Sequence, residues 1–374
     1  MKTSSIPTIL SLFIITLVLN SCTKEAGIKE APKLSTADCP RLASLTAEKK
    51  ETLYTVSTFA GVDQLYNSRV VDGVLCKARF GLAGGIAITP DGTIYISDSG
   101  IHNIRKISTK GIVSTLAGEP RGGGFCLGND DGIGPEALFC SPTEVVINKE
   151  SNLFLVESNG LGSVRKINPT ALVSTIISNY RLEGYQDGIL AQAKFGIFRT
   201  LALNPDGDIF IYDYTNNVIR KISTSELVTT YAGEKPVLGL PVRGYKDGPK
   251  ETALFGGLSD MTFTPDGSLY LCDVGNKKIR RITPAGVVET ISDIAAEAYS
   301  IAVSDKGIIL AATGQQIYKI DLNGTSQVIA GSKTSEYKDG VGTQAHFRDL
   351  KQMAIYKNYL YLTDGSTVRR MNIE

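Results

Sequence analysis

One short frame recurs five times along the chain and limits its fold more than any other feature. In each copy Asp-Gly is followed by four variable residues, then Ala, one more residue and Phe. The copies read DGVLCKARF, DGIGPEALF, DGILAQAKF, DGPKETALF and DGVGTQAHF, and they begin at Asp72, Asp131, Asp187, Asp247 and Asp339. A frame that returns in this way is typical of a repeat protein, in which one structural unit recurs.

Three further patterns lie between these copies. Turns such as Pro-Asp-Gly precede short alternating strands at 89–98, 204–213 and 264–273, with weaker copies at 148–157, 304–313 and 356–364. Strands like IRKI and then VSTLAG follow, and a small apolar strand precedes each turn. Each unit therefore supplies four short strands, called a to d here, as in the blade of a β-propeller.

The strand count gives the number of blades. Strands b and c each occur six times, but strand d follows strand c only five times, because the chain stops at Glu374. The missing copy is YTVSTFAG, residues 54–61, which precedes the first full unit. The sequence predicts an all-β fold: a six-bladed β-propeller of four-stranded antiparallel blades over 52–374. The N-terminal strand 54–61 completes the last blade and closes the ring.

The N-terminus carries a candidate export signal. Lys2 is followed by an apolar run at 9–19, which is too short to span a membrane. Leu-Asn-Ser-Cys, ending at Cys22, resembles a bacterial lipobox. We expect a signal peptide at 1–21 and a lipidated Cys22 with a tether at 22–51. This predicts a lipid-anchored protein of the bacterial cell envelope, at the outer membrane, facing the periplasm or the surface. A plain secretory signal with an incidental cysteine is the alternative.

Charge and cysteine usage narrow the class of partner. The net charge is +1, so no electrostatic feature favours nucleic acid. Export permits disulfides, and Cys126 and Cys140, which bracket one copy of the frame, are the candidate pair. The chain has two histidines and no CxxC spacing. The acidic stretch around Asp131 lacks the full calcium-loop pattern. We therefore expect neither a metal site nor a cofactor.

The segment DSGIHNIRKISTKGIVSTLAG (98–118), together with the DG-to-Phe frame, resembles the NHL-repeat family. The resemblance covers about 320 residues, although the tripeptide that names the family is degenerate here and retains His102. It implies a six-bladed propeller that binds proteins or envelope glycans. Related six-bladed propellers include metal-dependent lactonases, esterases and lyases with a site at the channel mouth.

An acidic residue at the end of strand b and an Arg in strand c recur together. In the fifth unit both are replaced, by Thr313 and Tyr318. Joint replacement indicates that the two side chains touch across the hairpin, so we predict a structural clasp. The pairs are Asp98–Arg105, Glu157–Arg165, Asp213–Arg220, Asp273–Arg280 and Asp364–Arg369.

The long d-to-a connections and the b-to-c loops emerge on one face, because antiparallel strands alternate direction. This face is the candidate recognition surface. Its candidate ligand-binding residues are aromatic, cationic or imidazole side chains: Tyr185, Tyr245, Tyr337, Phe125, Arg121, Arg181, Arg243 and His102. The alternative for the tyrosines is that they pack onto their own loops.

Two function classes remain open. The first is a non-catalytic, monomeric binding module for an envelope protein or glycan, and this class is favoured. The second is an enzyme of the metal-dependent lactonase, esterase or lyase type. The chain contains no G-x-S-x-G elbow, no HExxH and no histidine-centred triad, and no full set of convergent metal ligands can be matched.

Overall fold

The structure is a computed structural model of the full chain and describes residues 39–42, 45, 51–64, 70–119, 126, 128–158, 162–178 and 184–374. Two compact units are distinguished, 1–34 and 35–374, and the first lies wholly outside the described residues. The expected signal peptide, Cys22 and most of the expected tether therefore lie outside them as well. Within the described residues, no helix has the length and apolar character needed to cross a membrane.

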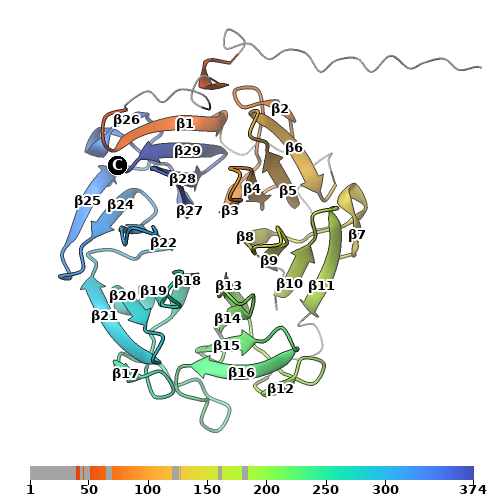
Figure 1. The fold of residues 1–374 in the computed structure, drawn as a ribbon, viewed down its shortest axis with the longest axis vertical. Helices are drawn as coiled ribbons and strands as arrows, with labels where there is room; N and C mark the ends of the chain where they lie inside the picture. The colour runs from red at the N-terminus through yellow and green to blue at the C-terminus, as the bar shows by residue number, and fades with distance from the viewer. Residues whose placement is uncertain are drawn as a thin grey trace, which may run out of the picture. The chain divides into compact units, whose positions relative to one another are not determined.

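Six small antiparallel sheets form a ring in the second unit, as predicted (Figure 1). Blade 1 contains β2 (Gly73–Val74), β3 (Ala83–Ile88), β4 (Ile94–Asp98), β5 (Asn103–Ile107) and β6 (Ile112–Ala117). Blade 2 contains β7 (Gly132–Ile133), β8 (Pro142–Ile147), β9 (Leu153–Glu157), β10 (Ser163–Ile167) and β11 (Leu172–Ser178). Blade 3 contains β12 (Gly188–Ile189), β13 (Phe198–Leu203), β14 (Ile209–Asp213), β15 (Val218–Ile222) and β16 (Leu227–Ala232).

The remaining blades follow the same order. Blade 4 contains β17 (Gly248–Pro249), β18 (Leu258–Phe263), β19 (Leu269–Asp273), β20 (Lys278–Ile282) and β21 (Val287–Asp293). Blade 5 contains β22 (Ser300–Val303), β23 (Ile309–Ala312), β24 (Gln316–Ile320) and β25 (Ser326–Gly331). Blade 6 contains β26 (Gly340–Val341), β27 (Leu350–Tyr356), β28 (Tyr359–Asp364) and β29 (Thr367–Asn372), together with β1 (Thr55–Gly61) from the start of the propeller.

The N-terminal strand closes the ring. β1 pairs antiparallel with β29, with Val56 opposite Met371 and Gly61 opposite Thr367. This pairing supplies the strand d that the end of the chain lacks, so the prediction of six blades closed by residues 54–61 is confirmed. Pairing here covers the edge that β29 would otherwise expose.

Five blades carry one strand more than predicted. The Gly of the DG frame and the residue after it form a two-residue strand on the outer edge of strand d, as where Gly73 faces Val113. The chain then turns and runs back along the flank, where Arg79 N–H bonds to the carbonyl of Val71. Much of each long d-to-a connection therefore covers the outside of a blade. Blade 5, which lacks the DG frame, has four strands.

The core consists of apolar clusters, several of which join residues of neighbouring blades. One of them combines Phe154 of blade 2 with Phe195 and Leu201 of blade 3. The Ala and Phe of the DG frame are fully or almost fully buried in all five copies, at 0–2% exposure. Burying a Phe side chain contributes about 1.5–3 kcal/mol, so the frame is a packing element.

Two disulfides join described cysteines. Cys126 is bonded to Cys140, the pair that the sequence favoured. Cys39 is bonded to Cys76 in blade 1, a pairing that the sequence did not single out. The turn Pro40–Leu42 follows, and Leu42 packs into the same cluster as Phe80. The expected tether at 22–51 thus includes one residue, Cys39, that is bonded covalently to blade 1.

Candidate functional site

The predicted acid–Arg pairs lie together in every blade that contains them. The five arginines are completely buried, and so are the acids at the ends of strands b. Nearest N–O separations are 3.8 Å in blade 1, 3.1 Å in blade 2, 3.5 Å in blade 3, and 2.7 Å in blades 4 and 6. Each acid also accepts a backbone N–H just after the frame's Phe, as Asp273 does from Gly256 at 2.9 Å. The pair thus fixes the loop as well as the hairpin.

The aspartate of the DG frame completes each clasp. Asp187 lies 2.8 Å from Arg220 and also accepts the hydroxyl of Thr230 in strand d at 3.1 Å. The guanidinium stacks on Phe195, the last residue of the frame, at 4.8 Å from the ring centroid. These aspartates therefore bind across the blade, to strand c and to strand d. A buried guanidinium flanked by two carboxylates is electrostatically satisfied.

The three described candidate tyrosines belong to the same arrangement. Tyr185, Tyr245 and Tyr337 stack on the clasp arginines at 5.0, 5.1 and 4.3 Å from the ring centroids. The hydroxyls of Tyr185 and Tyr245 hydrogen-bond to threonines of strand d at 2.5 and 2.9 Å. This is the packing that the alternative interpretation expected. A ligand-binding role for these tyrosines stays a prediction, and Tyr245 still exposes 49% of its surface.

The other predicted ligand-binding residues are dispersed. Arg121, Phe125 and Arg181 lie outside the described residues. His102 accepts the backbone N–H of Ser141 in the next blade at 3.0 Å, and burial lowers its pKa below the usual value. A neutral imidazole in this place joins two blades. Arg243 is exposed and donates to the carbonyl of Tyr214 in the b-to-c loop of blade 3 at 2.8 Å.

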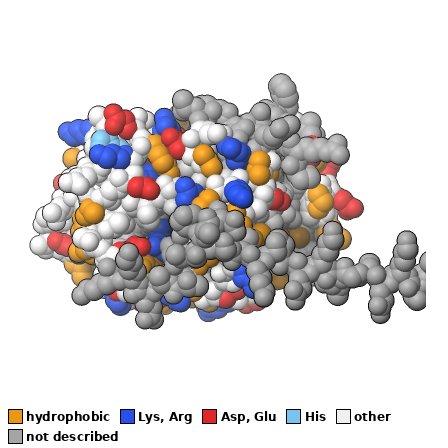
Figure 2. All heavy atoms as spheres, turned by 90° about the horizontal axis from the view of Figure 1, so that it is seen from above, with side chains coloured by type: hydrophobic (Ala, Val, Ile, Leu, Met, Phe, Trp, Pro, Cys, Tyr) orange, Lys and Arg blue, Asp and Glu red, His pale blue; other side chains and the backbone are white. Residues whose placement is uncertain are grey.

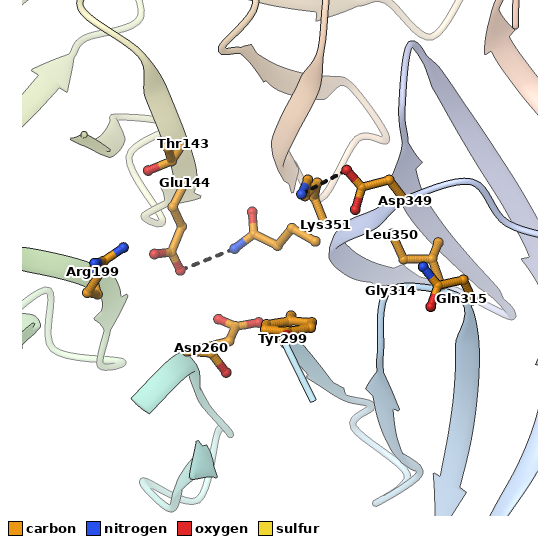
Figure 3. Close-up of a pocket in the computed structure, with 12 residues that line it drawn as sticks. Thr143, Glu144, Arg199, Asp260, Tyr299, Gly314, Gln315, Asp349, Leu350 and Lys351 are labelled. Atoms are coloured by element: carbon orange, nitrogen blue, oxygen red, sulfur yellow. Dashed lines mark hydrogen bonds and ion pairs between the residues drawn. The ribbon is translucent and has the colours of Figure 1, made fainter. Parts of the chain in front are cut away.

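A pocket of about 510 Å³ opens at the channel mouth, on the face of the b-to-c loops (Figure 3). Its walls come from the start of four inner strands and from the b-to-c loop of blade 5. Lining side chains include Thr143, Arg199, Ser259, Tyr299, Gln315 and Lys351. Figure 3 shows Glu144, Asp260 and Tyr299 arranged around this space from three different blades. The wall is polar, with hydroxyl, amide and cationic groups facing a common space.

The floor of this pocket ties neighbouring blades together. Glu144 of β8 accepts the backbone N–H of Leu201 in the next inner strand at 2.9 Å. Asp260 of β18 does the same for Ile301 at 2.8 Å, and Gln352 of β27 does so for Ile86 at 2.8 Å. These side chains replace the backbone pairing that is missing between inner strands, so their first role is structural.

Glu144 and Asp260 also interact with each other. Both are almost completely buried, at 6% and 4% exposure. Burial, followed by the charge of Asp260, raises the pKa of Glu144 well above its usual value. Burial raises the pKa of Asp260 to about 6, against the opposing effect of the Ile301 N–H and of a hydrogen bond with Glu144. Ionisation of both carboxyls at once is therefore disfavoured in this buried site.

The mouth does not match a metal centre built from charged or imidazole ligands. Across the described ranges, no three side chains of His, Cys, Asp or Glu come together in a way that could hold a metal ion. The two floor carboxylates have their oxygens occupied by backbone N–H groups, by Thr200 and by Gln352. The residues that are present fit a polar binding pocket better than they fit metal chemistry.

Sequence reasoning did not identify the floor residues, although a signal existed. Glu144, Asp260 and Gln352 occupy the same position in their inner strands, directly before the apolar residue that starts the buried stretch. An acidic or amide side chain at one fixed position of several inner strands, followed each time by an apolar residue, indicates a shared structural site. Arg199 stands one residue earlier in β13, at the rim.

Fold and site together define a six-bladed β-propeller with a polar pocket at its channel mouth. No family model matches the chain. Teneurin-3 of Danio rerio is 25% identical over 285 residues, which cover 68% of this chain and 10% of that protein. The chain thus spans about a tenth of the length of this curated relative.

Solved structures share the fold. A structural-genomics protein of unknown function from Bacteroides thetaiotaomicron has a TM-score of 0.61 at 17% identity, over 86% of this chain and 76% of that one. An auxiliary nutrient binding protein from Bacteroides ovatus has a TM-score of 0.56 at 12% identity, over 86% and 77%. Virginiamycin B lyase from Staphylococcus aureus has a TM-score of 0.54 at 11% identity, over 86% and 100%. The described part of this chain is therefore built like bacterial six-bladed propellers.

Proposed function

We propose that this chain is a non-catalytic binding module that captures a glycan in the channel-mouth pocket. We further propose that it is a lipoprotein of the NHL-repeat type, anchored in the bacterial cell envelope through Cys22. The observation that carries the proposal is the pocket itself. It holds about 510 Å³, lies on the face of the variable loops and is lined by Tyr299, Ser259, Gln315 and Arg199.

The chemistry of the lining residues and the similarity to a solved binding protein both support a glycan ligand. Sugars are recognised by hydroxyl and amide groups that hydrogen-bond and by aromatic rings that stack, and this wall supplies both kinds of group. The volume falls within the usual range for small-ligand sites. The Bacteroides ovatus neighbour is described as an auxiliary nutrient binding protein, which is consistent with ligand capture at a cell surface. The lipobox at Cys22 and the disulfides fit an exported protein.

The balance between acidic and basic side chains argues against a nucleic-acid partner. The chain has a net charge of +1. Figure 2 shows one flank of the propeller, where red and blue side chains are interspersed among the described residues. A nucleic-acid-binding face would concentrate positive charge.

A glycan array tests the proposal, together with a pull-down from envelope extracts for the protein partner that is the other option. Gln315 lines the pocket from a turn, and Gln315→Trp would fill the space with an indole. Gln327, which is exposed on β25 of the same blade, gives the matched control Gln327→Trp. We expect Gln315→Trp to lose binding and Gln327→Trp to keep it, with both variants melting like the original. Undiminished binding by Gln315→Trp would place the ligand elsewhere.

An enzyme is the second candidate, and the Glu144–Asp260 pair is the observation that favours it. A carboxyl whose pKa is raised by burial, as that of Glu144 is, is suited to act as a general acid. Virginiamycin B lyase and a gluconolactonase from Xanthomonas campestris share the fold, the latter with a TM-score of 0.51 at 11% identity over 86% and 94% of the two chains. Lactone or ester hydrolysis that is lost with a chelator and with Glu144→Gln would establish this candidate over binding.

A further inference from the structure

An unusual cationic cluster lies beside the mouth pocket, where one tyrosine ring is shared by two arginines. The guanidinium carbon of Arg199 lies 4.8 Å from the centroid of the Tyr214 ring, and that of Arg243 lies 4.9 Å from it. Arg199 comes from the start of the inner strand β13, Tyr214 from the b-to-c loop of blade 3 and Arg243 from the d-to-a connection. Three separate segments thus bring these side chains together.

Arg243 is held in place although it is exposed. It donates to the carbonyl of Tyr214 at 2.8 Å and to Oδ1 of Asn217 at 3.3 Å. Asn217 is buried and donates to the carbonyl of Val242 at 2.7 Å, which fixes the chain next to the arginine. A guanidinium positioned by the backbone loses little conformational freedom when it meets a ligand.

Among the residues that the structure describes, neither guanidinium has an acidic partner. No carboxylate oxygen of the described residues lies within 4.0 Å of Arg199 or Arg243. The clasp arginines provide the contrast, because Arg220, for example, contacts two carboxylates. Two cations that share one ring without an anion repel each other, and an anion placed beside both would relieve this repulsion.

The cluster adjoins the pocket and differs from the rest of its wall. Arg199 lines the pocket together with Ser259, Tyr299 and Gln315. The other cation of the wall, Lys351, is already paired with Asp349 at 2.9 Å. Of the two floor carboxylates, Glu144 has a pKa that burial and the charge of Asp260 raise well above its usual value. The free positive charge of the mouth is therefore concentrated on the Arg199 side.

We propose that the Arg199–Tyr214–Arg243 cluster makes the pocket selective for acidic glycans, which carry a carboxylate or a sulfate. This inference rests on the proposed function and names the class of its ligand. The anionic group would accept charge-assisted hydrogen bonds from the two guanidiniums, while the hydroxyl and amide groups of the wall bind the neutral part of the sugar.

The experiment uses an array that carries uronate, sialate and sulfate glycans beside neutral ones. Calorimetry on a trigalacturonate and its fully methyl-esterified form, which share one skeleton, follows. Arg199→Gln and Arg243→Gln remove one guanidinium each. Arg281→Gln is the control, because it removes an arginine of blade 4 that bonds to Glu289 at 2.6 Å. All measurements use the full chain.

We expect the acidic glycans to bind at least about tenfold more tightly than their neutral counterparts. The preference should disappear in Arg199→Gln and Arg243→Gln, weaken as salt is raised and persist in Arg281→Gln. The uronate, sialate and sulfate arms identify the acid. Equal binding of neutral glycans, or a preference that survives both arginine variants, overturns the inference and leaves the proposed function intact. Absence of binding to every glycan, acidic or neutral, overturns the proposed function itself.

Discussion

Replacing Arg220 by Met should be far more damaging than the loss of one side chain from one strand of blade 3 implies. Arg220 is completely buried and lies 3.5 Å from Asp213, which is also completely buried. Without the guanidinium, the Asp213 carboxylate has no cation in a site that water does not reach. Breaking a buried ion pair from one side costs about 3–5 kcal/mol. We therefore expect the free energy of unfolding of Arg220→Met to fall by about this amount.

A double-mutant cycle separates the pair from simple packing loss. Asp213→Asn combined with Arg220→Met removes the buried charge as well, so the double variant should be more stable than the sum of the single losses predicts, by about 1–3 kcal/mol. Urea unfolding followed by circular dichroism measures all four proteins. Blade 5 provides an internal precedent, because Thr313 and Tyr318 replace both partners there and Tyr318 is 6% exposed. Losses that add to within about 0.5 kcal/mol would refute the clasp.

Three further predictions concern the ring and the pocket floor. Replacing Cys39 and Cys76 by Ser should lower the free energy of unfolding by up to about 4 kcal/mol, because the bridge closes a loop of 37 residues; urea curves unchanged by the substitution or by reductant would contradict this. Removing β1 by starting the chain at Val62 should abolish cooperative melting, since β29 loses its partner, and an unaltered calorimetric transition would disprove ring closure. The raised pKa of Glu144 means that its stabilisation is complete below about pH 4.5 and is lost as the pH rises. The Glu144→Gln variant should therefore have the same melting temperature as the original protein at pH 4. Its melting temperature should fall less than that of the original between pH 4 and pH 7.

The architecture was predictable because the same strand and turn patterns recur in each repeat. Five copies of the DG frame, and the displaced strand at 54–61, were enough to give six blades and the closing pair with β29. The acid–Arg pairs were predictable for the same reason, because both partners are replaced together in blade 5. The contact between the frame's aspartate and the clasp arginine was not predicted, because in blade 3 the two residues lie 33 positions apart and no spacing rule connects them.

The pocket could not be predicted in this way. Glu144 and Asp260 lie in different blades, and each is the only charged residue of its inner strand. Their proximity depends on the curvature of the whole ring, which no local pattern encodes. The same holds for Arg199 and Arg243, which meet only because Tyr214 projects between two distant segments. Features that recur in every repeat can therefore be predicted from the sequence. A site to which each blade contributes a different residue cannot.

The disulfide between Cys39 and Cys76 affects how the propeller would resist a mechanical force applied to its N-terminal segment. If the chain is held by a lipid at Cys22, as we propose, tension reaches the propeller at Cys39, before β1 begins. The sulfur bond carries part of that force directly into blade 1, and Arg41 hydrogen-bonds to the carbonyl of Gly61 at 2.6 Å, at the far end of the strand. A pulling force on the N-terminal segment would therefore act first on the Cys39–Cys76 disulfide. The hydrogen bonds between β1 and β29 would bear less of that force.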